Sequence, residues 1–303
     1  MTMPLPLLIA WALLAPLVLL VASPLLDGVG RQIRARLESR AGPPLMQGYR
    51  DLAKLAGKSE VSSGVNPLAT LMPFVALAAA AAAGALLPVG GVAPLGGAGD
   101  ALVVLYLLGL SSVAVVLAGS ATGSPYGFLG AGREMLLLLF VEPVVACALF
   151  VVALKCGSFR LDVMAQWQMA HGPGVSGVLA GIGLMLALLG YMGRLPFDLS
   201  EAEQELMGGV TLEFGGRRLA LLRWTLFVRW LVVAWLVVVL FAPAPVQGVA
   251  GAAIALVEVV ALFALVSVLS ALVARLRIDH VRAYLVQVGM LMVFALLFAL
   301  IGV

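Results

Sequence analysis

Eight apolar runs, each about twenty residues long, constrain the fold of this chain more than any other feature of its sequence. None of them alternates with a period of two. In hydrocarbon every backbone N–H and C=O group must be paired within the protein, so the runs favour helices over a barrel. The expected spans are Leu5–Leu26, Leu68–Leu87, Ala101–Ala118, Met135–Leu154, Val175–Met192, Thr225–Phe241, Val249–Leu272 and Ala283–Ile301.

The composition agrees with a membrane protein. Hydrophobic residues make up 63% of the chain and charged residues 11%, whereas soluble domains have about 45–50% and 25%. The first run follows no basic segment and ends at no clear cleavage site, which favours a retained span over a signal peptide. We therefore predict an all-α polytopic membrane protein, with residues 1–303 as one membrane domain of eight transmembrane helices plus an amphipathic interfacial helix.

The basic residues predict how the spans are oriented. Only Lys155 and Arg160 fall in the second, fourth or sixth loops. By the positive-inside rule the odd-numbered loops are cytoplasmic, and both termini lie on the outer face of the cell's inner membrane. We expect protein partners on the cytoplasmic side and no nucleic acid. The odd-numbered loops carry Arg31, Arg34, Arg36, Arg40, Arg50, Lys54, Lys58, Arg133, Arg194, Arg217, Arg218, Arg223, Arg275, Arg277 and Arg282.

The first cytoplasmic loop, residues 27–66, contains the pattern of an amphipathic helix. Arg50 and Lys54 lie on other faces than its apolar residues, as in a helix that lies in the headgroup plane. Two interpretations stay open: these cations bind anionic lipid, or they form a docking floor for a cytoplasmic subunit. After the break at Gly42-Pro43-Pro44 the apolar residues recur at Leu45, Tyr49, Leu52 and Ala56.

A carboxylate, Glu142, interrupts the fourth apolar run next to Pro143. A charge at that depth costs a few kcal/mol even on lenient insertion scales, and Pro143 removes a helix hydrogen bond. Glu142 is therefore expected either to face a polar cavity on an ion path or to pair with an arginine such as Arg229. The same argument applies with less weight to Glu258 in the seventh run, which is a second candidate for an ion path.

The fifth loop, residues 193–224, is acidic. A capping box from Ser200 to Glu203 and salt bridges to Arg217 and Arg218 would explain part of it. Carboxylates crowded beside a membrane also raise one another's pKa, which suits proton exchange near neutral pH. Both readings stay open for Asp198, Glu201, Glu203, Glu205 and Glu213.

Part of this loop, GRLPFDLSEAEQEL followed by TLEFGG, resembles the PFD-x-x-EAE-x-EL…EY-S-G signature of a known family. The family is the membrane anchor subunit of formate hydrogenlyase and hydrogenase-4-type complexes, the group 4 energy-converting NiFe hydrogenases. It is similar in turn to the quinone-chamber subunit of respiratory complex I. The resemblance runs from about Arg31 to His280 and includes, in order, SRAGPPLMQGYRDLAKLAGKSEV, GSPYGFLGAGREMLLLLFVEP and RLRIDH.

The resemblance implies a subunit that is not catalytic on its own and binds no cofactor. Its partners would be hydrogenase-like large and small subunits and iron–sulfur subunits on the cytoplasmic face, which would hold the NiFe centre and the iron–sulfur clusters. Antiporter-like membrane subunits would join it in the bilayer. The chain would then couple electron transfer in the arm to translocation of protons or Na⁺.

The resemblance also assigns residues. Glu142 matches the family's buried carboxylate. The five acidic residues of the fifth loop match positions that line the chamber beneath the arm and open the proton path. Arg275, Arg277 and Asp279 match a polar turn before the last span. Adding the basic residues of the cytoplasmic loops, we expect partner docking at Arg34, Arg36, Arg50, Lys54, Arg133, Arg194, Arg217, Arg218, Arg275, Arg277 and Asp279.

No metal site is expected in this chain. There is no CxxC motif, and Cys147 and Cys156 would lie about 13 Å apart along a continuous helix, too far for a disulfide. His171 and His280 fall on opposite predicted faces of the membrane. These residues suit neither a cluster nor a metal ion.

Two residues depart from the family pattern. Tyr191 stands where the family usually has a Glu, and Ser270 where relatives often have an Ala-Glu pair. Both changes remove an intramembrane carboxylate, and a phenol with a pKa near 10 does not exchange protons readily at pH 7. These changes leave undecided which residues carry the coupled ion, and Glu258 is the alternative carboxylate for that route. They also allow an arm that is not a working hydrogenase.

Three functions remain: the membrane anchor of a hydrogenase-type complex, a complex I subunit that serves quinone reduction, and a secondary transporter. Phe214-Gly215-Gly216 and the Gly-Pro-Pro of the first loop favour the first over the second. No inverted repeat supports the third.

Overall fold

The computed structural model describes residues 5–60, 66–91, 93, 95, 100–200, 203–243, 246 and 248–302, with the backbone alone for residues 5–9, 203 and 204. Within these ranges eight helices are long and apolar enough to cross a membrane. The prediction of an all-α polytopic protein with eight spans is confirmed. The spanning helices are α1 (Leu5–Leu37), α3 (Pro67–Ala85), α4 (Ala101–Ser120), α5 (Pro125–Cys156), α7 (Gly174–Tyr191), α9 (Gly216–Phe241), α10 (Val249–Leu272) and α11 (Ile278–Ile301).

Four short elements connect the spans: α2 (Gln47–Ala56), α6 (Leu161–His171), α8 (Glu203–Leu206) and the 3₁₀ turn η1 (Gly209–Thr211). Three spanning helices extend beyond their apolar runs. Helix α1 continues past Leu26 to Leu37, α5 begins at Pro125, and α9 begins at Gly216, inside the segment expected to be the acidic loop. Hydropathy marks the part of a helix that suits hydrocarbon, whereas the backbone helix continues through charged turns outside it.

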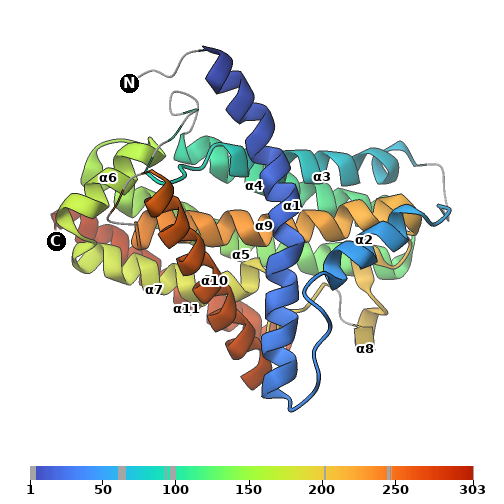
Figure 1. The fold of residues 1–303 in the computed structure, drawn as a ribbon. Coiled ribbons are helices and arrows are strands. Elements are labelled where there is room, and N and C mark those ends of the chain that lie inside the picture. The colour runs from blue at the N-terminus through green and yellow to red at the C-terminus, as the bar shows by residue number, and fades with distance from the viewer. Residues whose placement is uncertain are drawn as a thin grey trace.

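Helix α9 forms the centre of the bundle. In its most apolar window 72% of the residues are buried, compared with 28% in α11. It packs against α1, α3 and α10, while α5 packs against α4, α7 and α11. Figure 1 shows α9 running through the middle of the molecule, with α1 crossing it steeply and α10 lying obliquely beside α1. Because so many helices meet α9, its side chains face several distinct environments.

Helix α2 lies against α1 and α9, where the amphipathic helix was predicted (Figure 1). Leu52 packs with Ala220 and Phe227 of α9. The Tyr49 hydroxyl donates a hydrogen bond to the main-chain carbonyl of Val21 in α1. The polar face of α2, with Arg50 and Lys54, is exposed. Protein contacts therefore hold the apolar face of this helix.

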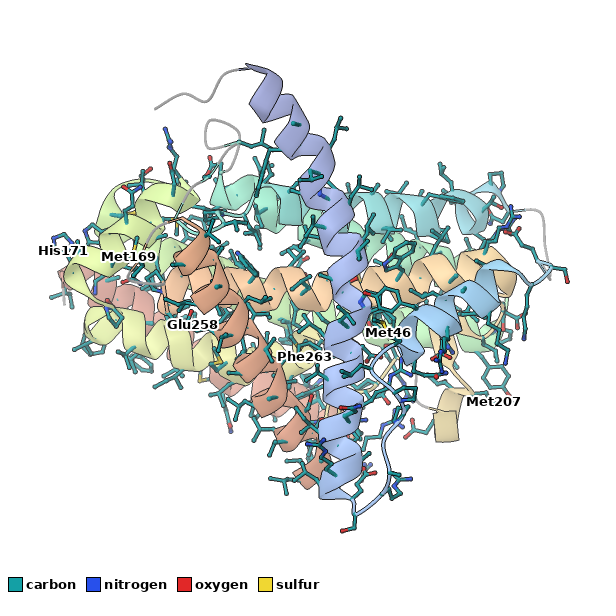
Figure 2. All side chains as sticks on the ribbon, viewed as in Figure 1. Met46, Met169, His171, Met207, Glu258 and Phe263 are labelled. Atoms are coloured by element: carbon teal, nitrogen blue, oxygen red, sulfur yellow. The ribbon has the colours of Figure 1, made fainter. Side chains whose placement is uncertain are left out.

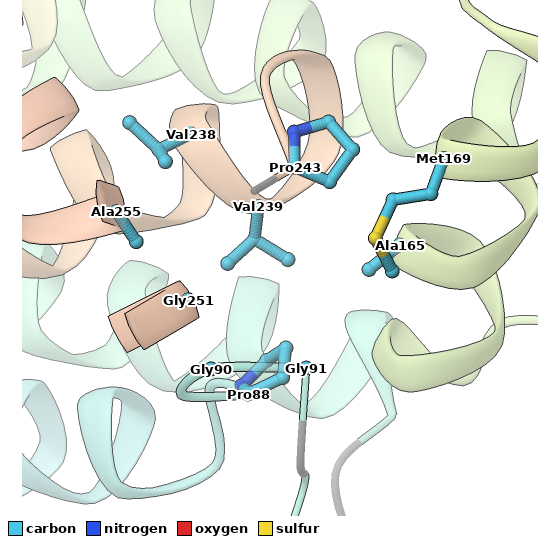
Figure 3. A pocket seen from close by; sticks show the side chains of 10 residues that line it. All are labelled: Pro88, Gly90, Gly91, Ala165, Met169, Val238, Val239, Pro243, Gly251 and Ala255. Carbon is cyan, nitrogen blue, oxygen red and sulfur yellow. The ribbon is translucent and has the colours of Figure 1, made fainter. Parts of the chain in front are cut away.

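At the predicted outer end, main-chain acceptors tie loops to helices. Trp235 Nε1 donates to the Pro88 carbonyl at 2.9 Å, and the Gly248 N–H donates to the Gly90 carbonyl at 2.8 Å. Figure 3 shows a cavity of about 30 Å³ among these segments, with Met169 of α6 and Pro243 in its wall. That space holds about one water molecule. This end of the bundle is closely packed.

The turn η1 packs on α5 through glycine. A Cβ at Gly130 would lie 2.7 Å from the Val210 nitrogen and 2.8 Å from the Gly209 Cα. Gly209 itself has a φ of +50°, which favours glycine. Two backbones therefore meet here, and Val210 is buried beside them. This contact fixes the second half of the acidic loop to the membrane domain.

We predict that Gly130→Ala separates this loop from α5. The new methyl group would meet backbone atoms that cannot rotate away, and overpacking of this kind costs roughly 1–3 kcal/mol. The measurements are the thermal unfolding midpoint of the detergent-purified protein and the rate of proteolysis in residues 193–215. Both should show a loosened loop.

Gly132→Ala is the matched control. It lies on the same helix, and its Cβ would meet nothing within 4 Å. Alanine is favoured over glycine within a helix by up to about 1 kcal/mol, so this variant should be as stable as the parent or slightly more so. Equal effects of the two substitutions would contradict the proposed contact.

Candidate functional site

Five polar side chains from four helices meet inside the bundle and are called here the membrane cluster: Ser112 of α4, Glu134 and Glu142 of α5, Tyr191 of α7 and Arg229 of α9. Arg229 is buried, and its Nη1 lies 3.8 Å from Glu134 Oε1. Its Cζ lies 5.2 Å from the centre of the Tyr191 ring. One cation thus contacts a carboxylate and an aromatic ring.

Glu142 is half-buried, and its Oε1 has no hydrogen-bond partner among the described residues. Gly109 of α4 makes room for it, since a Cβ there would lie 2.7 Å from Oε1. Beside Glu142 lies a groove of about 530 Å³ between α4 and α5. The walls of this groove are mainly apolar, with Leu105 and Leu139 among the lining residues, whereas the sequence predicted a polar cavity at Glu142.

The structure shows no ion pair between Glu142 and Arg229, which was the alternative prediction, although the two side chains interact electrostatically. The arginine forms its ion pair with Glu134 and acts on Glu142 over a longer distance. Sequence reasoning did not select Glu134, because the predicted span begins at Met135 and leaves Glu134 in the loop before it. The signal that could have found it is the spacing of eight residues between Glu134 and Glu142, which is about two helical turns.

A second group of charges links the helices at their predicted cytoplasmic ends and is called the charge network: Asp27, Arg31, Asp51 and Arg194. Arg194 Nη2 lies 3.0 Å from Asp27 Oδ1, with 8% and 6% of the two side chains exposed. Arg31 pairs with Asp27 and, at 3.1 Å, with Asp51 of α2. The network joins α1, α2 and the segment after α7.

Arg194 was expected on the docking face, and the structure places it inside instead. Its Cζ lies 4.2 Å from the Trp230 ring centre and 5.0 Å from that of Phe263. Burial lowers the pKa of Arg194 to about 10 against the opposing effect of Asp27, so it stays charged at neutral pH. Sequence shows the arginine but not the carboxylate that reaches it from α1.

A cavity of about 260 Å³ lies beside the charge network, between α1, α2, η1 and α9. Its walls combine charge with aromatic surface and include Arg31, Asp51, Arg223, Phe227 and Trp230. Such a lining suits an amphipathic occupant with a polar head. The cavity lies next to the helix that was predicted to form the docking floor.

The acidic loop is only partly described. Glu201 lies outside the described residues, and the side chain of Glu203 is not described. Glu205 accepts a hydrogen bond from Arg133 at 2.5 Å, and this bond holds the pKa of the Glu205 carboxyl below its usual range. The expected rise from crowding is wrong for Glu205, because the neighbour in space is a cation seventy-two positions away in sequence.

The other candidates of this region are spread over the same end of the molecule. The Asp198 carbonyl accepts a hydrogen bond from Arg275, and Glu213 is half-buried. Arg218 pairs with Glu60 at 3.2 Å. Glu60 belongs to the first loop, so this ion pair does not involve a carboxylate of the acidic loop.

The candidate docking residues divide into exposed and internally bonded groups. Arg277 and Asp279 form an exposed ion pair of 3.9 Å. Arg34 donates to Ser270 Oγ at 3.0 Å, which shows that the residue in place of a family carboxylate binds an arginine of α1. The other exposed side chains among these candidates are Arg36, Arg50, Lys54 and Arg217.

Glu258 lies apart from the membrane cluster. Figure 2 shows it on α10, nearer than Phe263 to the end of the molecule that carries Met169 and His171. Helix α10 packs against α1 and α9. The Glu258 Oε2 is buried without a hydrogen-bond partner in the described part of the chain. Glu258 is therefore a separate intramembrane carboxylate.

Where the structure describes side chains, no group of three or more His, Cys, Asp or Glu residues is placed to hold a metal ion.

Comparison with known proteins identifies the family. The model of the NADH dehydrogenase family matches residues 9–301. Hydrogenase-4 component C of Escherichia coli (strain K12) is 39% identical over 78% of this chain and 76% of that protein. Formate hydrogenlyase subunit 4 of the same strain is 35% identical over 78% of each chain.

More distant relatives extend the similarity. NADH-quinone oxidoreductase subunit 8 of Thermus thermophilus is 30% identical over 76% of this chain and 68% of that protein. A chain in the structure of the membrane-bound sulfane sulfur reductase, an archaeal respiratory membrane complex, superposes with a TM-score of 0.90 at 25% identity, covering 96% of this chain and 99% of that one. These relatives belong to multisubunit membrane complexes, and the chain itself belongs to the NADH dehydrogenase family of multi-pass membrane subunits.

Proposed function

We propose that this chain anchors a cytoplasmic redox arm to the cell's inner membrane and couples electron transfer in that arm to translocation of protons or Na⁺. The observation that carries the anchor role is its 39% and 35% identity to the two hydrogenase-complex subunits. The arm would contain hydrogenase-like large and small subunits and iron–sulfur subunits, which would hold the NiFe centre and the clusters. This chain would hold none of them.

The exposed face of α2 supports a docking role for the cytoplasmic end. Arg50 and Lys54 point away from the bundle, while Leu52 fixes the helix against α9. A helix anchored by protein contacts presents its charges in a defined place, which suits a protein partner better than mobile lipid does. In this orientation both termini lie on the outer face, as the basic loops predict.

The membrane cluster supports a coupling role. Carboxylates buried in a spanning region are costly and mark ion paths or charge pairing. Glu142 has an unpaired oxygen and opens on the groove between α4 and α5. Around that groove the apolar side chains are exposed, Tyr106 by 75% and Leu139 by 64%. We assign this face to a neighbouring antiporter-like membrane subunit, to which the ion would pass.

The alternative is a subunit of an NADH:quinone oxidoreductase. The cavity beside the charge network favours it, because Phe227 and Trp230 could contact a quinone ring or tail while Arg31 and Arg223 face its head. The identity to the complex I relative is lower, at 30%. A third possibility, a redox arm that acts on another substrate such as sulfane sulfur, is suggested by the similarity to the sulfane sulfur reductase chain.

Affinity purification of the tagged chain in mild detergent tests these functions together. Hydrogenase-like and iron–sulfur subunits with nickel and hydrogen evolution would support the anchor of a hydrogenase. The same subunits without nickel would indicate another substrate for the arm. Co-purified quinone with NADH-oxidising subunits would favour the alternative, and a chain that purifies alone would reject the anchor role and call for transport assays.

We predict that Glu142→Gln keeps the complex assembled but lowers ion translocation per electron by at least about tenfold, since glutamine keeps the shape and cannot ionise. The measurement is pumping by the complex in proteoliposomes. Glu258→Gln is the comparison, because Glu258 lies on α10, away from the membrane cluster. Unchanged pumping in the Glu142 variant would make that carboxylate structural.

We also predict that Arg50→Glu combined with Lys54→Glu releases the cytoplasmic arm. Reversing two exposed charges should lower recovery of the arm roughly tenfold, equivalent to about 1.4 kcal/mol. The control is the exchange Arg50→Lys with Lys54→Arg, which keeps the charge at both positions. Intact recovery with the charge-reversed variant would contradict docking on α2.

A further inference from the structure

Three residues of the membrane cluster carry buried polar atoms without a hydrogen-bond partner in the described structure. They are Tyr191 Oη, Glu142 Oε1, and Nε and Nη1 of Arg229. Each unsatisfied buried group costs roughly 1–3 kcal/mol. Three such residues on adjacent helices are a costly arrangement for packing alone, and polar atoms of this kind are suited to holding water or moving protons.

Tyr191 occupies the centre of this arrangement. It is buried, and Arg229, Glu142 and Ser112 are the polar side chains that act on its phenol. None of them forms a well-aligned hydrogen bond with Oη. A phenol can both donate and accept, so Oη is able to bond on two sides at once.

The two carboxylates of the cluster cannot exchange a proton directly. Glu134 and Glu142 lie on the same helix eight residues apart, which is about 12 Å along its axis. Arg229 interacts with both of them, and the Tyr191 ring lies against Arg229. The phenol and the guanidinium, from α7 and α9, therefore face the stretch of α5 that separates the carboxylates.

We propose that the Tyr191 hydroxyl relays protons between Glu134 and Glu142 through bridging water. Glu134 gives its proton to the water, the water passes a proton to Oη, and the original Oη proton moves to the Glu142 carboxylate. One O–H bond forms and one breaks on the phenol oxygen, so Tyr191 stays neutral throughout. Glu134 ends as a carboxylate and Glu142 as a carboxylic acid.

This relay rests on the proposed function and removes a difficulty in it. A phenol that only passes a proton on need not ionise, so a tyrosine can stand at this position without stopping exchange. Arg229 acts as a positioning residue, because its charge stabilises whichever of the two carboxylates is ionised.

The test is Tyr191→Phe in the complete complex reconstituted in proteoliposomes. Electron transfer with an uncoupler present should stay near the parent rate, while ion translocation per electron should fall at least about tenfold. The infrared band of the protonated Glu142 carboxyl group, identified by its loss in Glu142→Gln, should also shift when the phenol is removed. Tyr126→Phe is the matched control, since that tyrosine is exposed at the start of α5 and lies outside the membrane cluster.

Parent-like translocation and an unchanged carboxyl band in Tyr191→Phe would overturn the relay. If that variant does not assemble, Glu134→Gln decides: it removes the donor of the relay, and parent-like translocation with it would equally overturn the proposal. Failure of the proposed function looks different. In that case neither the parent complex nor Glu142→Gln would show coupled translocation, whereas failure of the relay alone would leave Glu142→Gln defective.

Discussion

The buried ion pair between Asp27 and Arg194 determines how the predicted cytoplasmic end of the bundle is assembled. It joins α1 to the segment after α7, and the same guanidinium lies against Trp230 of α9 and Phe263 of α10. Gly30 allows α1 to approach α10 closely beside it, since a Cβ there would lie 2.8 Å from Ser267 Oγ and 3.3 Å from Arg194 Nη1. Removing either partner of such a pair strands the other charge at a cost of roughly 3–5 kcal/mol.

Helix α9 connects this pair to both functional regions. Phe227 and Trp230, three residues apart and so on one face, line the cavity beside the charge network, whereas Arg229 turns toward the membrane cluster. A single rigid helix thus carries side chains of the docking end and of the intramembrane site. Any displacement of α9 at the cavity would also change the position of Arg229 between Glu134 and Glu142.

Sequence alone predicted the spans and α2 and selected Glu142 as a candidate, because each is a local signal: an apolar run, a helical period, or a lone carboxylate in hydrocarbon. It did not predict which charges meet. Asp27 and Arg194 are 167 positions apart, and Arg133 and Glu205 are 72 apart. Pairing at such separations depends on how the helices pack, so the pKa of Glu205 and the burial of Arg194 were beyond local reasoning.

Charge balance within the membrane cluster explains why a neutral residue at position 191 suits this chain. Arg229 supplies one positive charge, and Glu134 and Glu142 can supply two negative ones. Burying the second anion without a partner is costly. The two carboxylates therefore favour a state in which one of them binds a proton and Arg229 balances the negative charge of the other carboxylate. A third carboxylate, at position 191 in place of the tyrosine, would compete for Arg229 and bind a proton of its own. A phenol adds no charge, so the shared proton remains the one that can move.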